Sequence, residues 1–129
     1  MPRVAIYARE RPDRGGRRRL DRQVAAISAQ VARQRGWQHV ATYGDLDLRP
    51  ADSRPGFGRL LAEAPGHIDV VVVDGYGRLS LSRAELGALL AHLSALGVQT
   101  VVLRPPAGRR LARLVANLAL ADAVGSAAR

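Results

Sequence analysis

The sequence contains no cysteine, which excludes a disulfide framework and a thiolate metal site. Histidine is scarce, and His39, His67 and His92 are scattered without the spacing of metal ligands, so we expect structural roles for them. Aromatic residues make up only 4% of the 129 residues, so a core must be built from Val, Leu, Ile and Ala. We therefore expect neither a metal nor a cofactor.

Long apolar runs are missing as well, and so is an amino-terminal targeting segment. These absences favour a cytoplasmic protein with no membrane partner. A chain of 129 residues suits one domain. We place that domain at residues 3–124 and expect only a short tail at 125–129.

Lysine is also absent, so all 20 basic residues are arginine and the net charge is +9 at pH 7. A basic excess favours a polyanionic partner, usually nucleic acid. The abundance of arginine and alanine is equally typical of a GC-rich coding bias, so charge alone leaves the question open. Arginine nevertheless suits phosphate, because its planar fork binds two oxygens at once.

Apolar periodicity predicts strands that alternate with helices. Ser82 and Glu85 form a capping box, and Gly97 ends the helix that they begin. The alternation indicates a three-layer α/β domain with a mainly parallel sheet of four or five strands. The segments 14–19 and 44–54 are predicted to be loops, the first flexible and basic. The predicted strands are 3–8, 39–43, 68–74 and 98–103, and the predicted helices are 20–35, 55–64, 83–96 and 107–124.

Ligands of such sheets lie at the carboxyl ends of the strands. Several charged residues follow these ends: Arg9, Arg11, Asp45, Asp47, Asp74, Arg78 and Arg104. The aspartates at 45, 47, 52 and 74 could suggest a metal site, but their spread over a long loop favours solvated turn residues.

Four segments together resemble the catalytic domain of the serine recombinases, the family of resolvases and invertases. The resemblance covers roughly residues 3–120, with the order and spacing of the family. The segments are Ile6-Tyr7-Ala8-Arg9, Leu20-Asp21-Arg22-Gln23, Ser53-Arg54-Pro55-Gly56-Phe57, and Val71-Val72-Val73-Asp74 followed by Arg78-Leu79-Ser80.

The resemblance implies metal-free phosphoryl transfer. In the family a serine attacks a DNA phosphodiester and becomes linked to the 5′ end, while arginines stabilise the charge on the phosphate. The positions kept here are Arg9, Gln23, Arg54 and Arg78. Arg11 stands at the position of the nucleophile, Gly77 replaces an acidic residue, and Leu81 replaces an arginine. A guanidinium cannot attack phosphorus, because it stays protonated.

We therefore expect a catalytically inactive protein that binds the DNA backbone weakly or associates with a recombinase. The alternatives are a divergent enzyme that still cleaves DNA and a pure protein-interaction module. The candidate phosphate contacts are Arg9, Arg11, Arg54 and Arg78, with Arg17, Arg18 and Arg19 as further candidates. The opposing interpretation is that these arginines form ordinary ion pairs with nearby aspartates.

The predicted last helix is apolar nearly all round, which favours self-association through it. The resemblance implies that this helix forms a dimer, or pairs with an active recombinase. No helix-turn-helix module follows, so we expect no separate DNA-binding domain and no specific groove readout. The residues expected in the dimer helix are Leu111, Leu114, Val115 and Leu118.

Overall fold

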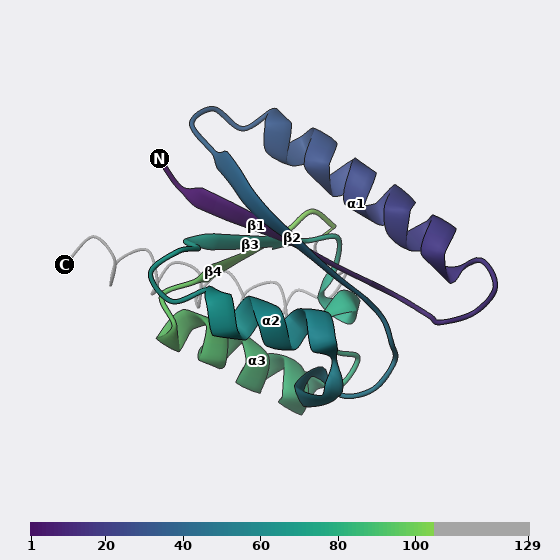
Figure 1. Cartoon of the computed structure of the whole chain (residues 1–129). Coiled ribbons are helices and arrows are strands. Elements are labelled where there is room, and N and C mark those ends of the chain that lie inside the picture. Colours follow the sequence, from purple (N-terminus) through teal and green to yellow (C-terminus); the bar gives the residue numbers. More distant parts are fainter. Residues whose placement is uncertain (105–129) are drawn as a thin grey trace.

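Four parallel strands form one sheet in the computed structural model, which describes residues 1–104. The strand order is β2-β1-β3-β4, so β1 and β3 lie inside the sheet (Figure 1). The strands are β1 (Arg3–Glu10), β2 (Gln38–Leu46), β3 (Val70–Val73) and β4 (Gln99–Val102). The helices are α1 (Gly16–Ala32), α2 (Pro55–Glu63) and α3 (Arg83–Ala95), with short 3₁₀ turns η1 (Ala51–Ser53) and η2 (Tyr76–Arg78).

The sheet has helices on both faces (Figure 1). On one face Val4, Ile6 and Val72 pack against Ile27 and Val31 of α1. On the other, the alternate residues of the same strands contact α2 and α3, in a cluster that includes Ala5, Tyr7, Phe57, Leu60, Val71, Leu90 and Leu93. Strands that are covered on both faces have continuous apolar sequences, and the sequence of β3 is of this kind. The predicted three-layer α/β fold is confirmed.

Two predicted loops prove to be partly regular. Helix α1 begins at Gly16 rather than at residue 20, so Arg17 to Arg19 form its first turn instead of a flexible loop. A turn before the helix fixes its start, because the Gly16 amide donates to the carbonyl of Asp13 over 3.0 Å. Strand β2 continues to Leu46, because residues 44–46 pair with residues 8–10 of β1. Arg9 and Glu10 therefore belong to a strand.

The predicted order is confirmed for the first seven elements. The predicted helix at 107–124, with its expected dimer residues, lies outside the described residues. Within residues 1–104 no helix is long and apolar enough to cross a membrane.

Candidate functional site

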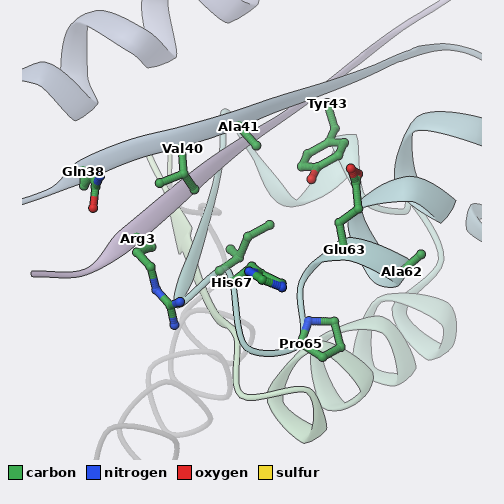
Figure 2. Close-up of a pocket in the computed structure, with 10 residues that line it drawn as sticks. Arg3, Gln38, Val40, Ala41, Tyr43, Ala62, Glu63, Pro65 and His67 are labelled. Atoms are coloured by element: carbon green, nitrogen blue, oxygen red, sulfur yellow. The ribbon is translucent and has the colours of Figure 1, made fainter.

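The two edges of the sheet each carry a cavity. The cavity at the edge where the strands begin has a volume of about 700 Å³ and is lined by β2, the end of α2 and the segment before β3 (Figure 2). Arg3 lines it, but its guanidinium donates to both Asp69 oxygens over 3.0 Å and to the Gly66 carbonyl over 2.6 Å. Of the site residues predicted within residues 1–104, none lines this cavity.

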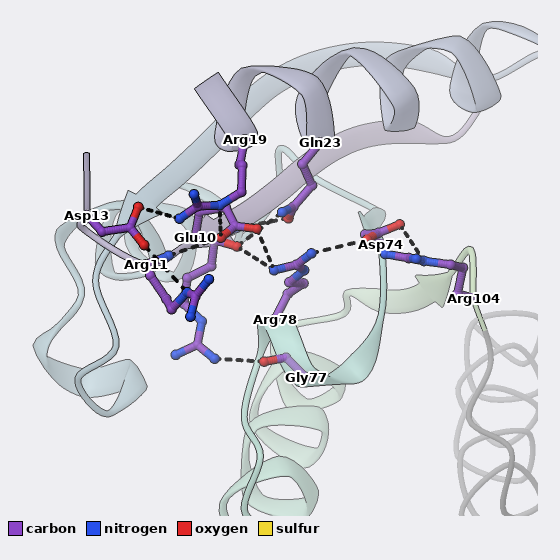
Figure 3. Close-up of polar contacts among 10 residues, drawn as sticks. Glu10, Arg11, Asp13, Arg19, Gln23, Asp74, Gly77, Arg78 and Arg104 are labelled. Carbon is purple, nitrogen blue, oxygen red and sulfur yellow. Dashed lines mark hydrogen bonds and ion pairs between the residues drawn. The ribbon is translucent and has the colours of Figure 1, made fainter. Parts of the chain in front are cut away.

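The edge where the strands end carries the arginine pocket, which has a volume of about 400 Å³. A second pocket, of about 290 Å³, shares Arg9, Leu48 and Leu81 with it. We use the name arginine pocket for the space lined by Arg9, Glu10, Arg11, Arg19, Leu48, Gly77, Arg78 and Leu81. Figure 3 shows the polar contacts around it.

Arg9 is held by its backbone as well as by its side chain. Its amide donates to Gln23 Oε1 over 3.0 Å, and Gln23 Nε2 donates back to its carbonyl over 3.1 Å. Its guanidinium donates to the Gly77 carbonyl over 2.7 Å. Burial, and then the nearby charge of Arg54, lower the pKa of Arg9. Gln23 thus positions β1 against α1 and does not line the pocket.

Glu10 lies among the arginines. Its carboxylate accepts from Arg19 Nε over 3.2 Å, from Arg78 Nη1 over 3.1 Å and from the Arg11 amide over 3.2 Å. Burial by itself would raise the pKa of Glu10, but the hydrogen bonds from Arg19 and from the Arg11 amide, with the charge of Arg78, hold it below its usual value of 4.5. The carboxylate therefore stays charged.

Arg78 is committed to partners on three sides. Besides Glu10, its Nη1 donates to the Arg9 carbonyl over 3.1 Å, and its Nη2 lies 3.5 Å from Asp74 Oδ2. Asp74 also accepts from Arg104, whose Nε lies 3.1 Å from Oδ1. The opposing interpretation, that some of these arginines form ion pairs with aspartates, therefore holds for Arg78 with Asp74 and for Arg11 with Asp13. Arg17 and Arg19 pair with aspartates as well.

Arg11 follows β1 and is the most solvent-accessible of the pocket arginines. Its side chain is 65% exposed, and its Nε lies 3.7 Å from Asp13 Oδ2. Asp13 also accepts from Arg19 Nη2 over 2.5 Å. The loop passes so close to α1 that a Cβ on Gly16 would lie 2.1 Å from the Arg11 carbonyl oxygen. The absence of a side chain at Gly16 therefore allows the loop that carries Arg11 to pass this close to α1.

Arg54 lies apart from the arginine pocket. Its side chain is 2% exposed and donates to the Arg49 carbonyl over 2.7 Å and to the Leu79 carbonyl over 2.8 Å. It lines the second pocket and ties the loop before α2 to the turn η2. Its Nη2 also lies 3.8 Å from Glu85 Oε1. Arg54 therefore shares the second pocket with Arg9 rather than lining the arginine pocket, and its role as a phosphate contact stays a prediction.

Asp45 proves to be a structural carboxylate rather than a solvated turn residue. It is 5% exposed and accepts from the amides of Gly56 and Phe57 over 2.7 and 2.9 Å, and from the Tyr7 hydroxyl over 2.8 Å. Asp45 thereby satisfies amides in the first turn of α2, whose own N-cap residue, Arg54, makes no side-chain cap bond. Burial raises the pKa of Tyr7.

The hydroxyl groups near the site have structural partners. Ser80 Oγ accepts from the Ser82 amide over 3.0 Å, and Ser82 Oγ accepts from the Glu85 amide over 3.3 Å. The predicted cap of α3 by Ser82 is confirmed. Both serines line the second pocket and neither lines the arginine pocket.

The structure thus brings Arg9, Arg11, Arg19 and Arg78 together and leaves Arg17 and Arg18 on the exposed surface of α1, where Arg17 pairs with Asp21. The sequence reasoning missed Glu10 and Leu48. The signal for Glu10 was its place beside Arg9 at the end of a buried strand. Within residues 1–104 no group of three or more histidine, cysteine or acidic residues could hold a metal ion.

Comparison with known proteins gives a family match over almost the whole chain. The family described as "Resolvase, N terminal domain" matches residues 4–123. No curated protein matches the chain.

Solved structures share the fold. The N-terminal catalytic domain of TP901-1 integrase is 21% identical with a TM-score of 0.70, and the match covers 98% of each chain. The C-terminal catalytic domain of ISC1926 TnpA, an IS607-like serine recombinase, is 23% identical with a TM-score of 0.71, covering 90% of this chain and 78% of that one. A serine recombinase from Sulfolobus solfataricus is 24% identical with a TM-score of 0.67, covering 92% of this chain and 78% of that one.

Proposed function

This chain belongs to the resolvase family of serine recombinases, and on that basis we propose that it is a catalytically inactive member that binds DNA through the arginine pocket. The family acts on DNA, so the backbone phosphate is the ligand that the pocket's chemistry suggests. Binding is expected to be weak and independent of base sequence, because guanidinium–phosphate contacts carry no base information.

The observation that carries the proposal is the lining of the pocket. Arg11 stands where the resemblance places the attacking serine, and among residues 1–104 no serine, threonine, tyrosine or cysteine lines the pocket. Covalent phosphoryl transfer needs a nucleophile within reach of phosphorus. Arg11 instead offers a permanent cation, which can attract a phosphate but cannot attack it.

The two neighbouring serines are poor substitutes. Ser80 is 7% exposed, and its Oγ holds the backbone of the turn before α3. Ser82 caps α3, so moving its hydroxyl towards a phosphate would break the cap and cost about 1 kcal/mol. Their committed hydrogen bonds support an inactive protein over a divergent enzyme.

Gly77 and Leu81 are two neighbouring positions at which this chain lacks the charged residues of the family. A Cβ on Gly77 would lie 3.3 Å from Leu81 Cδ2, so the two positions are neighbours. The resemblance places an acidic residue and an arginine there, which could pair with each other. Here the contact is apolar, and Leu81 is 90% exposed beside the pocket. The site therefore lacks one further charge for stabilising a transition state.

The remaining cations suit binding. Arg11 is exposed, and Arg9 and Arg78 are fixed at the pocket wall, so a phosphate oxygen could contact more than one guanidinium. Self-association through the residues Leu111, Leu114, Val115 and Leu118 would double this surface, and it stays a prediction from the sequence. Recombinase partners could be held by the same helix.

The test is equilibrium binding of a fluorescent duplex by Arg11→Ala, with Arg35→Ala as the matched control. Both residues are exposed and both changes remove one positive charge, but Arg35 lies beyond the far end of α1. We expect Arg11→Ala to weaken binding about threefold to tenfold and to reduce the salt slope by about one. The double change Arg9→Ala and Arg78→Ala should weaken it further.

Three outcomes contradict the proposal. Equal effects of Arg11→Ala and Arg35→Ala would mean that only net charge matters. Absence of binding by the unchanged protein at about 50 mM salt would favour a protein-interaction module instead. A covalent protein–DNA adduct would favour the divergent enzyme.

A further inference from the structure

We infer that Glu10 acts as an internal anion that competes with DNA phosphate for the arginines of the pocket. This inference rests on the proposed function and identifies the group that limits DNA binding at the same site. It is carried by the position of one carboxylate, which lies between two guanidinium groups and lines the pocket that they form (Figure 3).

The contacts of Glu10 match those that a phosphate would need. Its two oxygens receive three donors: Arg78 on Oε1, and Arg19 and the Arg11 amide on Oε2. A phosphate placed among the same residues would seek the same donors, because charge-assisted bonds to guanidinium and backbone amide are its usual partners. The carboxylate and an external phosphate therefore exclude each other at Arg19 and Arg78.

Carboxylates neutralise part of the positive charge around the pocket. Arg11 and Arg19 lie near Asp13, and Arg78 shares Asp74 with Arg104. Among the residues that the structure describes, Glu10 is the one carboxylate that lines the pocket itself. Its side chain is 12% exposed, so water screens it less than it screens Asp13, which is 47% exposed. Removing its charge would leave Arg78 paired with Asp74 and Arg19 paired with Asp13, and both would gain capacity for phosphate.

The alternative role for Glu10 is purely structural, as a clamp between α1, β1 and the turn η2. The two roles predict opposite effects on binding. Loss of a clamp lowers stability and, through disorder of the arginines, lowers affinity. Loss of a competing anion lowers stability but raises affinity.

The test compares Glu10→Gln with Glu63→Gln in duplex binding. Both changes replace a carboxylate by an amide of the same shape and raise the net charge by one. Glu63 lines the cavity at the opposite edge, near Tyr43 (Figure 2). We expect Glu10→Gln to bind about tenfold more tightly than the unchanged protein, with a salt slope steeper by about one. Glu63→Gln should change affinity by less than about twofold.

Glu10→Gln that binds no more tightly than Glu63→Gln overturns the inference, whether or not the unchanged protein binds DNA. The proposed function is judged separately, by binding of the unchanged protein. Binding by Glu10→Gln alone would support the competing anion and contradict the proposed function. Glu10→Ala serves as the second variant if the amide prevents folding, and the same comparison with Glu63→Gln decides the outcome.

Discussion

At the edge where the strands begin, Arg3 meets Asp69 in a one-to-one pair, whereas at the edge where they end four arginines line one pocket with Glu10. Arg3 uses its backbone amide and three guanidinium nitrogens on Asp69 and Gly66. It joins β1 to the residue before β3 and has little left to offer a ligand. At the other edge one carboxylate serves both Arg19 and Arg78, and Arg11 projects into solvent.

An arginine whose donors are taken by its own protein acceptors has a structural role. An arginine that shares a carboxylate with other arginines, or that is exposed, is a candidate for binding. Arg54 makes the same point within the site. The resemblance groups it with Arg9 and Arg78, but its side chain is buried, its Nε and Nη1 donate to backbone carbonyls, and its Nη2 lies 3.8 Å from Glu85 Oε1. Residue type alone does not distinguish these cases.

The largest effect on stability is expected from the carboxylate buried near the site. Asp45→Ala should lower the free energy of unfolding by about 3 kcal/mol, because two amides of α2 and the Tyr7 hydroxyl lose their acceptor. Asp69→Ala at the opposite edge should cost about 1 kcal/mol, because its side chain is 41% exposed. Urea unfolding measures both. Equal losses would mean that Asp45 is not the organising acceptor.

A smaller loss is expected where the Arg11 loop meets α1. Gly16→Ala should cost about 2 kcal/mol, because the added methyl would overlap the Arg11 carbonyl. Gly58→Ala in α2 is the control, since nothing lies within 4 Å of its added Cβ. That change should stabilise the protein by about 0.5–1 kcal/mol. Thermal unfolding of both variants tests the difference, and a neutral Gly16→Ala would contradict the tight approach.

Lowering the pH should weaken the ion pairs at both edges of the sheet. The Arg3 hydrogen bonds lower the pKa of Asp69, and the arginines lower that of Glu10 below 4.5. A lowered pKa in the folded state stabilises the protein above the unfolded value, and this contribution is lost as pH falls through the folded value. The stability difference between the unchanged protein and Glu10→Gln should therefore shrink below pH 4.5. Urea titrations across this range measure it, and a constant difference would contradict the ion pairing of Glu10.

The order of elements could be predicted from the sequence, because strand and helix periodicities depend on neighbouring residues. The runs at 4–8 and 70–73 and the capping box of Ser82 are local signals of this kind. The end of β2 could not be predicted, because Gly44 to Leu46 form a strand only through pairing with β1. Contacts between residues that are distant in the chain determine where such an element ends.

The site was predictable to the same degree. The placement of Arg9, Arg11 and Arg78 at one edge follows from the parallel topology. The role of Asp45 depends on the docking of α2 eleven residues later, and the burial of Arg54 depends on the turn η2. The contacts of Glu10 with Arg19 and Arg78 depend on the extension of β1 to residue 10 and on its approach to α1 and η2.

The smallest effect is expected from restoring a hydroxyl alone. Arg11→Ser should form no covalent adduct with nicked duplex DNA, because Gly77 and Leu81 still lack the charges that the resemblance assigns to their positions. A variant that also carries Gly77→Asp and Leu81→Arg is the one in which an adduct is expected. Denaturing electrophoresis of labelled DNA distinguishes the two. An adduct with Arg11→Ser alone would show that these two positions matter less than proposed.

We propose that the arginine pocket holds DNA phosphate and that the protein does not cut the strand. The most direct measurement incubates the unchanged protein with a labelled suicide duplex and records anisotropy and covalent adduct on the same samples. We expect the unchanged protein to bind the duplex in a salt-dependent manner and to form no adduct at any protein concentration. An adduct that survives denaturation would contradict the account.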